Sequence, residues 1–172
     1  MAVDFSSFDN FIASTLGETI GEGECWNYIN LLWDHLGSKY WTYPPSDPSA
    51  TNHGVKYGWI NTDARAANTI THLTQVQNLI DIKKGDVVVI SQGTYGHAGF
   101  AKQGVINNTL ELYSQNWQHR YVTLDNVSMA TFLGGWRYDA WQETPPTPSV
   151  RVIARPQKFK WALYARKLRE KY

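Results

Sequence analysis

The chain has 172 residues, of which 42% are hydrophobic and 18% are charged. This length suits one compact domain, and the composition excludes a disordered or fibrous protein. Residues 1–144 carry 8 Lys and Arg against 14 Asp and Glu, whereas residues 145–172 carry 8 against 1. The net charge of +1 is therefore the sum of an acidic body and a basic tail. We expect no nucleic-acid partner.

The single cysteine, Cys25, excludes an intrachain disulfide and any metal site built from several cysteines. Its thiol either packs as a small hydrophobic group or reacts. The sequence has no apolar run long enough to cross a membrane, and its first residues lack the basic and apolar regions of a signal peptide. We therefore expect a protein without a transmembrane segment, signal peptide, metal or cofactor.

Three helices are predicted in the first half of the chain. Apolar residues recur three or four apart over residues 5–16, with Ser6 or Ser7 as the candidate N-cap. The same spacing recurs over residues 25–36, before a glycine. Residues 62–80 are rich in Ala, Leu and Gln and are predicted to form the third helix.

An antiparallel sheet is predicted to follow. Val87–Ile90 is a short, continuous apolar run typical of a buried strand. Further strands are expected from residue 96 to 101, from 110 to 117 and from 132 to 138, where the last closes the sheet. Residues 107–108 are two asparagines that suit a hairpin turn. Helices followed by antiparallel strands indicate an α+β domain.

Aromatic residues are unusually frequent, with eight Trp and ten Tyr. Residues 39–60 combine several of them with Pro, Gly and Ser, which predicts a loop that forms the wall of a ligand groove. Core packing alone could use most of the remaining rings.

The C-terminal part of the chain is predicted to be separate from the body. Residues 143–149 are a Pro-rich linker, and residues 150–172 are predicted to form a basic amphipathic helix whose apolar residues share one face. This pattern suits an anionic polymer such as teichoic acid, a membrane surface, or an acidic partner such as a second subunit or a virion component. Alternatively, the helix packs on the acidic body of its own chain.

Cys25 opens the second predicted helix, so its thiol lies in the first turn. Free backbone N–H groups and the helix dipole favour a thiolate there, and the thiolate is the nucleophilic form of cysteine. A protonated His partner lowers a cysteine pKa from roughly 8.5 to about 3.5–7.5. The position also fits a cysteine that faces the core of an amphipathic helix.

His97 is the histidine whose setting indicates chemistry. It follows a predicted buried strand, between Gly96 and Gly99, small residues that leave room for a substrate backbone. In a Cys/His hydrolase the imidazole activates the thiol and protonates the leaving amine, while a third polar residue orients the ring. Asn116, on the next strand, is the candidate for that third residue, although it also suits a strand end. The remaining histidines are predicted to be packing or surface residues: His35, His53, His72 and His119.

Five short motifs, in this order and at these spacings, resemble the CHAP domain (cysteine, histidine-dependent amidohydrolase/peptidase) of phage lysins. The resemblance covers roughly residues 5–140, and the combination is more specific than any single motif. The motifs are Gly23-Glu24-Cys25-Trp26-Asn27-Tyr28, Lys84-Gly85-Asp86-Val87-Val88-Val89, Gly96-His97-Ala98, Ser114-Gln115-Asn116-Trp117 and Gly134-Gly135-Trp136-Arg137-Tyr138.

The resemblance implies a papain-like α+β catalytic domain over residues 1–142, with N-terminal helices packed on an antiparallel sheet. It implies hydrolysis of bacterial peptidoglycan, at the muramoyl–L-alanine amide or at a peptide bond of the stem or cross-bridge. Cys25 would be the nucleophile, His97 the base and Asn116 the residue that orients the ring. We expect three aromatic residues to bind substrate: Trp41, Tyr95 and Trp117.

Two departures from the family pattern matter. Many phage CHAP domains have a Glu two residues before the Asn, where this chain has Ser114. Several relatives bind calcium through alternating Asp residues before the cysteine, whereas this chain has Glu18, Glu22 and Glu24 at a different spacing. We therefore predict a Cys-His-Asn set without a calcium requirement.

Three classes of function remain open. The first is a peptidoglycan hydrolase that is released from the host cytoplasm through a holin, or that is carried on the virion. The second is a non-enzymatic phage tail or wall-binding protein that retains the CHAP fold. The third is another papain-like activity on peptides outside the wall, such as an NlpC-type hydrolase, although these usually have a second His where this chain has Asn116.

Overall fold

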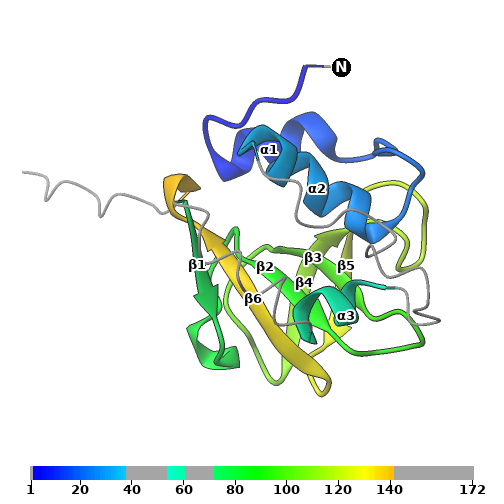
Figure 1. Cartoon of the computed structure of the whole chain (residues 1–172), viewed down its shortest axis with the longest axis vertical. Coiled ribbons are helices and arrows are strands. Elements are labelled where there is room, and N and C mark those ends of the chain that lie inside the picture. The colour runs from blue at the N-terminus through cyan, green and yellow to red at the C-terminus, as the bar shows by residue number, and fades with distance from the viewer. Residues whose placement is uncertain (1, 38–53, 61–71, 142–172) are drawn as a thin grey trace, which may run out of the picture. The chain divides into compact units, whose positions relative to one another are not determined.

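The computed structural model describes residues 2–37, 54–60 and 72–141. Helix α1 (Phe8–Thr15) and helix α2 (Cys25–His35) come first, followed by the short helix α3 (Val55–Ile60). In Figure 1, α1 and α2 lie together on one side of the strands. The described ranges also contain the 3₁₀ helices η2 (Leu79–Asp81) and η3 (Asp139–Trp141).

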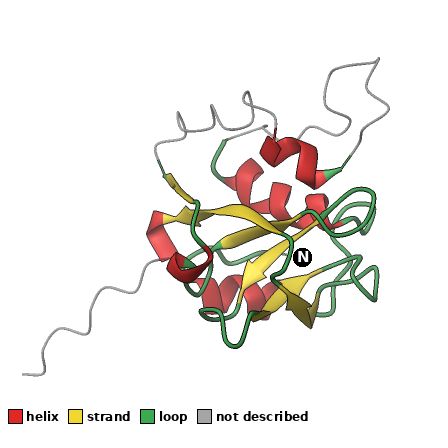
Figure 2. Cartoon of the chain, turned by 90° about the horizontal axis from the view of Figure 1, so that it is seen from below, coloured by secondary structure: helices red, strands yellow, loops and turns green. Residues whose placement is uncertain are grey.

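Six strands form one antiparallel sheet in the order β1-β6-β2-β3-β4-β5. Their bounds are β1 Leu73–Val76, β2 Val87–Ile90, β3 His97–Ala101, β4 Thr109–Ser114, β5 Thr123–Ser128 and β6 Phe132–Tyr138. Seen from below, the strands (yellow) occupy the middle of the chain with helical segments (red) around them (Figure 2). The α+β fold class predicted from the sequence is therefore confirmed.

The two predicted N-terminal helices are confirmed. Ser7 is the N-cap of α1, and its hydroxyl accepts a hydrogen bond from the backbone N–H of Asn10 at 3.2 Å. A wide apolar face of α2 is buried against the sheet, and this face includes Tyr28, Leu32 and Trp33.

The third predicted helix is wrong where the structure describes it. Leu73–Val76 is strand β1, paired with β6 over the whole of its length. Leu73 and Val76 are buried in this pairing, so tertiary contacts outweigh the local helix preference. Residues 61–71 lie outside the described residues.

The expected loop over residues 39–60 is wrong at its C-terminal end, because residues 55–60 form α3. Trp59, expected in a groove wall, is instead 7% exposed and packs edge-on against Trp136, with ring centroids 4.7 Å apart. Residues 39–53, including Trp41, lie outside the described residues, as do the linker 143–149 and the tail 150–172.

Strands β2, β3 and β6 are confirmed, and β4 ends at Ser114 rather than at Trp117. Asn107 and Asn108 have φ values of 49° and 57° between β3 and β4, the left-handed pair that a tight hairpin turn requires. Strand β6 does not lie at an edge of the sheet, because it pairs with both β1 and β2.

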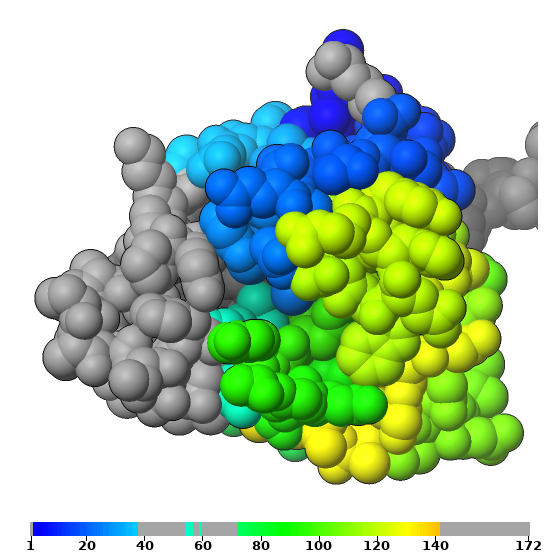
Figure 3. Space-filling model, turned by 90° about the vertical axis from the view of Figure 1, so that its right-hand side faces the viewer, coloured from blue at the N-terminus to red at the C-terminus, as the bar shows by residue number. Residues whose placement is uncertain are grey.

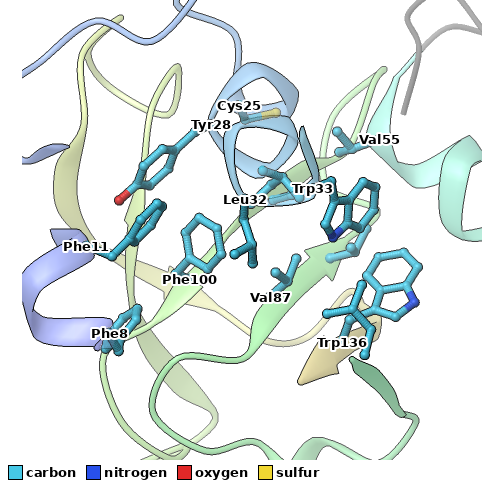
Figure 4. Packing of buried hydrophobic residues seen from close by; sticks show 14 of the residues in the cluster. Phe8, Phe11, Cys25, Tyr28, Leu32, Trp33, Val55, Val87, Phe100 and Trp136 are labelled. Atoms are coloured by element: carbon cyan, nitrogen blue, oxygen red, sulfur yellow. The ribbon is translucent and has the colours of Figure 1, made fainter. Parts of the chain in front are cut away.

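The core has two parts, one on each face of the sheet. Alternation along β2 sends Val87 and Val89 toward the helices and Val88 toward the other face. Figure 4 shows the helix-side cluster, in which aromatic rings from both N-terminal helices pack against Phe100 of β3. Within the described ranges, no helix is long and apolar enough to cross a membrane.

Candidate active site

Cys25 is the first residue of α2, as predicted, and it is 8% exposed. Its thiol accepts a hydrogen bond from the backbone of Ala98, the residue after His97. The helix start is capped, because the side chain of Asn27 accepts a hydrogen bond from the backbone N–H of Glu24 at 3.1 Å. In Figure 4 the sulfur lies at the margin of the aromatic core, on the same helix as Leu32 and Trp33.

The environment of Cys25 favours the neutral thiol. Burial, with a smaller contribution from the carboxylate of Glu24, raises its pKa to about 11, although the backbone hydrogen bond from Ala98 acts in the opposite direction. Desolvation therefore outweighs the stabilisation of a thiolate that the helix N-terminus was expected to provide.

His97 is the first residue of β3 and pairs with Ile90 at the end of β2. It is 3% exposed, and burial lowers its pKa to about 4. Its Nε2 atom is buried without a hydrogen-bond partner. Trp117 packs against the imidazole, with ring centroids 4.8 Å apart and planes tilted by 45°.

The structure brings Cys25 to the backbone beside His97 but does not pair the two side chains. Within the described part of the chain, no hydrogen bond joins the thiol to the imidazole. Both groups are buried and both pKa shifts favour the neutral form. The resting pair is therefore a neutral thiol and a neutral imidazole at neutral pH.

Asn116 lies just after β4, in a left-handed backbone conformation with φ 63°, which Asn tolerates better than most residues. Its exposed side-chain amide donates to Oε2 of Glu24, whose other oxygen pairs with Arg120 at 2.8 Å. The structure thus joins Asn116 to the residue before Cys25. The predicted role of orienting His97 would require Asn116 to exchange Glu24 for the imidazole.

Close steric contacts explain why glycines stand at positions 96 and 99, near His97. A Cβ on Gly96 would lie 2.7 Å from the carbonyl oxygen of Ile90 and from Cβ of Lys56, and its φ is +74°. A Cβ on Gly99 would lie 2.8 Å from Cβ of Ser114. The prediction that these positions leave room for a substrate backbone is wrong, because neighbouring strands and α3 fill the space.

Two polar residues near the site were missed in the sequence. Gln115 is fully buried and bonds to both backbone groups of Ile20 and to the carbonyl oxygen of Glu24. Arg120 donates to the carbonyl of Glu22 at 2.6 Å and to the carboxylate of Glu24. A polar Gln directly after a strand was the available signal, but its partners are 91 and 95 residues away.

The expected substrate-binding aromatics have different surroundings. Tyr95 is 58% exposed, two residues before His97. Trp117 is half-buried against the imidazole. Ser114, which replaces the Glu of many relatives, is buried and donates to Oδ2 of Asp125 at 3.2 Å.

The other described histidines have packing or surface roles. His35 stacks on Phe5 with ring centroids 3.8 Å apart, and His119 stacks on Tyr121. His72 is exposed, and His53 lies outside the described residues. Among residues 2–37, 54–60 and 72–141, no three His, Cys, Asp or Glu side chains are grouped so as to hold a metal ion.

No protein-family model and no curated protein matches this sequence. Among solved structures, the chain is similar to the endolysin LysIME-EF1, with 16% identity over 78% of this chain and 65% of that one and a TM-score of 0.51. It also matches Ly7917, with 18% identity over 74% of this chain and 60% of the other, at a TM-score of 0.49. The structure of Ly7917 with the hydrolyzing product of MDP has the same identity and coverage and a TM-score of 0.46.

The chain shares its α+β fold with LysIME-EF1. It spans 65% of the length of that structure and 60% of the length of Ly7917.

Proposed function

We propose that this chain is a cysteine-dependent peptidoglycan hydrolase of the lysin type, with a CHAP-like catalytic domain in which Cys25 is the nucleophile and His97 the base. The observation that carries the proposal is the contact between the Cys25 thiol and the backbone of Ala98, next to His97. It brings a cysteine at a helix start and a buried histidine at a strand start to the same place, although they are 72 positions apart in the sequence.

The unpartnered Nε2 of His97 supports the same assignment. A buried imidazole nitrogen without a hydrogen bond costs free energy, so a purely structural role gives no reason for a histidine here. A base needs a nitrogen that can accept a proton. The fold shared with an endolysin, an enzyme class that degrades the bacterial wall, supports the choice of substrate.

The mechanism begins from the neutral pair. His97 takes the thiol proton as the sulfur of Cys25 attacks the carbonyl carbon of the amide, which forms a C–S bond. The imidazolium then protonates the amine as the C–N bond breaks, leaving a thioester. Water attacks the thioester with His97 again as base, which releases a carboxylic acid and regenerates the thiol.

Because no hydrogen bond joins the thiol and imidazole at rest, substrate binding has to bring them into reach. Catalytic hydrogen bonds often tighten only in the substrate complex. Trp117 and Tyr95 are the aromatic side chains we assign to substrate contact. Asn116 is the polar residue that would exchange its hydrogen bond to Glu24 for one to His97 when substrate binds.

The proposal is tested with purified peptidoglycan from several Gram-positive walls. Wild-type protein should release new amino termini and Cys25→Ala should not. Fragment masses then separate cleavage at the muramoyl–L-alanine amide from cleavage within the stem or cross-bridge. Release of amines at equal rates by both proteins would contradict a thiol mechanism.

A second candidate is a non-enzymatic wall-binding or phage structural protein with the same fold. The raised pKa of Cys25 and the absence of a thiol–imidazole hydrogen bond in the described residues favour it. This candidate predicts that wild type and Cys25→Ala pellet equally with insoluble peptidoglycan and that neither releases amines.

A further inference from the structure

The segment 115–122 after β4 contacts His97 and the part of the chain that leads into Cys25. Trp117 packs on the His97 ring. Gln115, Asn116 and Arg120 bond to the segment that leads into Cys25. In Figure 3 the yellow-green surface of this segment lies directly against the blue surface of the N-terminal segment. We call residues 115–122 the bridging segment.

Gln115 is the buried centre of this contact. Its Oε1 accepts the N–H of Ile20 at 3.1 Å, while its Nε2 donates to the carbonyl oxygen of Ile20 at 2.8 Å and to that of Glu24 at 2.6 Å. The side chain is fully buried, so water cannot replace these partners. Glu24 is the N-cap of α2. The hydrogen bond from Gln115 to its carbonyl oxygen therefore holds the residue directly before Cys25, where the helix begins.

The outer part of the contact is ionic and exposed. Arg120 donates to the carbonyl of Glu22 and the carboxylate of Glu24, with its side chain 60% exposed. A Cβ on Gly23 would lie 2.8 Å from the carbonyl oxygen of Arg120. The close approach of the two segments therefore depends on a glycine directly before the helix cap.

The arrangement gives a reason for a buried glutamine beside the site. An apolar side chain of similar size could fill the volume, but it would not fix the position of the chain before Cys25. The three hydrogen bonds of Gln115 do fix the position of this part of the chain. The bridging segment also carries Trp117, so the same segment contacts both the imidazole of His97 and the residue before Cys25.

We propose that Gln115 is a positioning residue of the active site, which holds the start of α2 so that the Cys25 thiol faces the beginning of β3. Arg120 reinforces this from the surface. The inference rests on the proposed function for its effect on turnover. Its effect on the thiol itself can be measured whether or not the protein is a hydrolase.

The experiment compares wild type with Gln115→Met, which keeps the side-chain length and removes all three hydrogen bonds. Arg137→Met is the matched control. It breaks the buried ion pair with Asp86, the residue before β2. His97 pairs with Ile90 at the other end of β2. Asp86 and Ile90 are roughly 13 Å apart at the usual rise per residue of a strand. Turnover of soluble peptidoglycan fragments and the rate of alkylation by iodoacetamide are measured on each full-length protein. Cys25 is the only thiol, so alkylation reports on it alone.

In Gln115→Met, kcat should fall at least about tenfold with KM within about threefold of wild type, because positioning acts on the chemical step. The alkylation rate should rise about tenfold or more as the thiol loses its buried, fixed place. Arg137→Met, with similar or greater loss of stability, should change neither quantity by more than about threefold. Equal effects in the two variants would overturn the inference, since both would then reflect stability alone.

Two outcomes separate this inference from the proposed function. If wild type releases no amines from any wall, the hydrolase proposal fails and the alkylation rates alone decide the role of Gln115. If Gln115→Met does not fold, the exposed Arg120→Met variant decides. An alkylation rate at least about threefold above wild type supports the inference, and an unchanged rate overturns it.

Discussion

The indole of Trp117 packs against the imidazole of His97 with ring centroids 4.8 Å apart. This contact covers one side of the imidazole, the proposed base. Burial is the cause of the low pKa of His97. The two residues come from different elements, the start of β3 and the segment after β4, so the pKa of the base depends on where that segment lies.

Removal of the indole should therefore raise the pKa of His97. In Trp117→Ala we expect the pKa to move from about 4 toward 6.5, as water reaches the ring. Trp117→Phe keeps an aromatic cover and should shift the pKa less. NMR titration of the histidine ring protons measures the value, and an unchanged pKa in Trp117→Ala would show that other neighbours desolvate the ring.

The stability of the fold should depend on pH through His97. The folded protein takes up the imidazole proton only near pH 4, whereas the unfolded chain takes it up near 6.5. Between these values the unfolded state binds more protons, so the free energy of unfolding falls as the pH drops, by about 3 kcal/mol in total. His97→Gln cannot titrate and should lose this part of the dependence.

Urea denaturation of wild type and His97→Gln across this pH range isolates the effect, because the carboxylates titrate in both proteins. A constant difference in stability between the two at all pH values would mean that the imidazole is not desolvated in solution.

Cys25 should react slowly with alkylating reagents in the resting protein. With a pKa of about 11 instead of 9.0, the thiolate population near pH 8 is about 100-fold smaller than in an unfolded chain. The rate of carbamidomethylation, followed by mass spectrometry with and without denaturant, checks this. Fast alkylation of the folded protein would instead indicate a thiolate paired with an imidazolium before substrate binds.

The ion pair between Arg137 and Asp86 should stabilise the fold. Asp86 is fully buried, and Arg137 donates to both of its carboxylate oxygens, at 2.9 and 2.7 Å. In Arg137→Met the buried carboxylate keeps, among the described residues, the hydrogen bond from the backbone N–H of Lys83. Loss of its ion partner should cost about 3–5 kcal/mol.

Adding Asp86→Asn to Arg137→Met should recover part of that loss, because the unpaired charge disappears. Chemical denaturation of the single and double variants gives the coupling energy. Additive losses would show that the two side chains stabilise the fold independently.

The parts of the fold predicted from the sequence are those set by local pattern. The apolar periodicity of α2 and the four-residue run of β2 are buried on the faces that their spacing indicates. Strand β5 was missed because its apolar positions are separated by Asp125 and Asn126, which rarely occur in strands. Strand β1 was mistaken for helix because it is stabilised by its pairing with β6, whose paired residues lie 59 (Val76 with Gly135) to 65 (Leu73 with Tyr138) positions later.

The places of the candidate site residues in the fold could be predicted in part. The position of Cys25 at the helix start and of His97 at the strand start follows from element boundaries in the sequence. The partner of Asn116 could not be predicted, because Glu24 comes within reach only when the bridging segment folds onto the start of α2. The neutral state of the thiol depends on burial by distant segments, which a helix-dipole argument does not include.

The central claim is that Cys25 cleaves an amide of peptidoglycan with His97 as the base. The most direct measurement is the initial rate of amine release from purified peptidoglycan by wild type, Cys25→Ala and His97→Gln, with folding of each protein verified by circular dichroism. The account predicts release by wild type and rates lower by about 1,000-fold or more in both variants. Equal release by wild type and Cys25→Ala would contradict it.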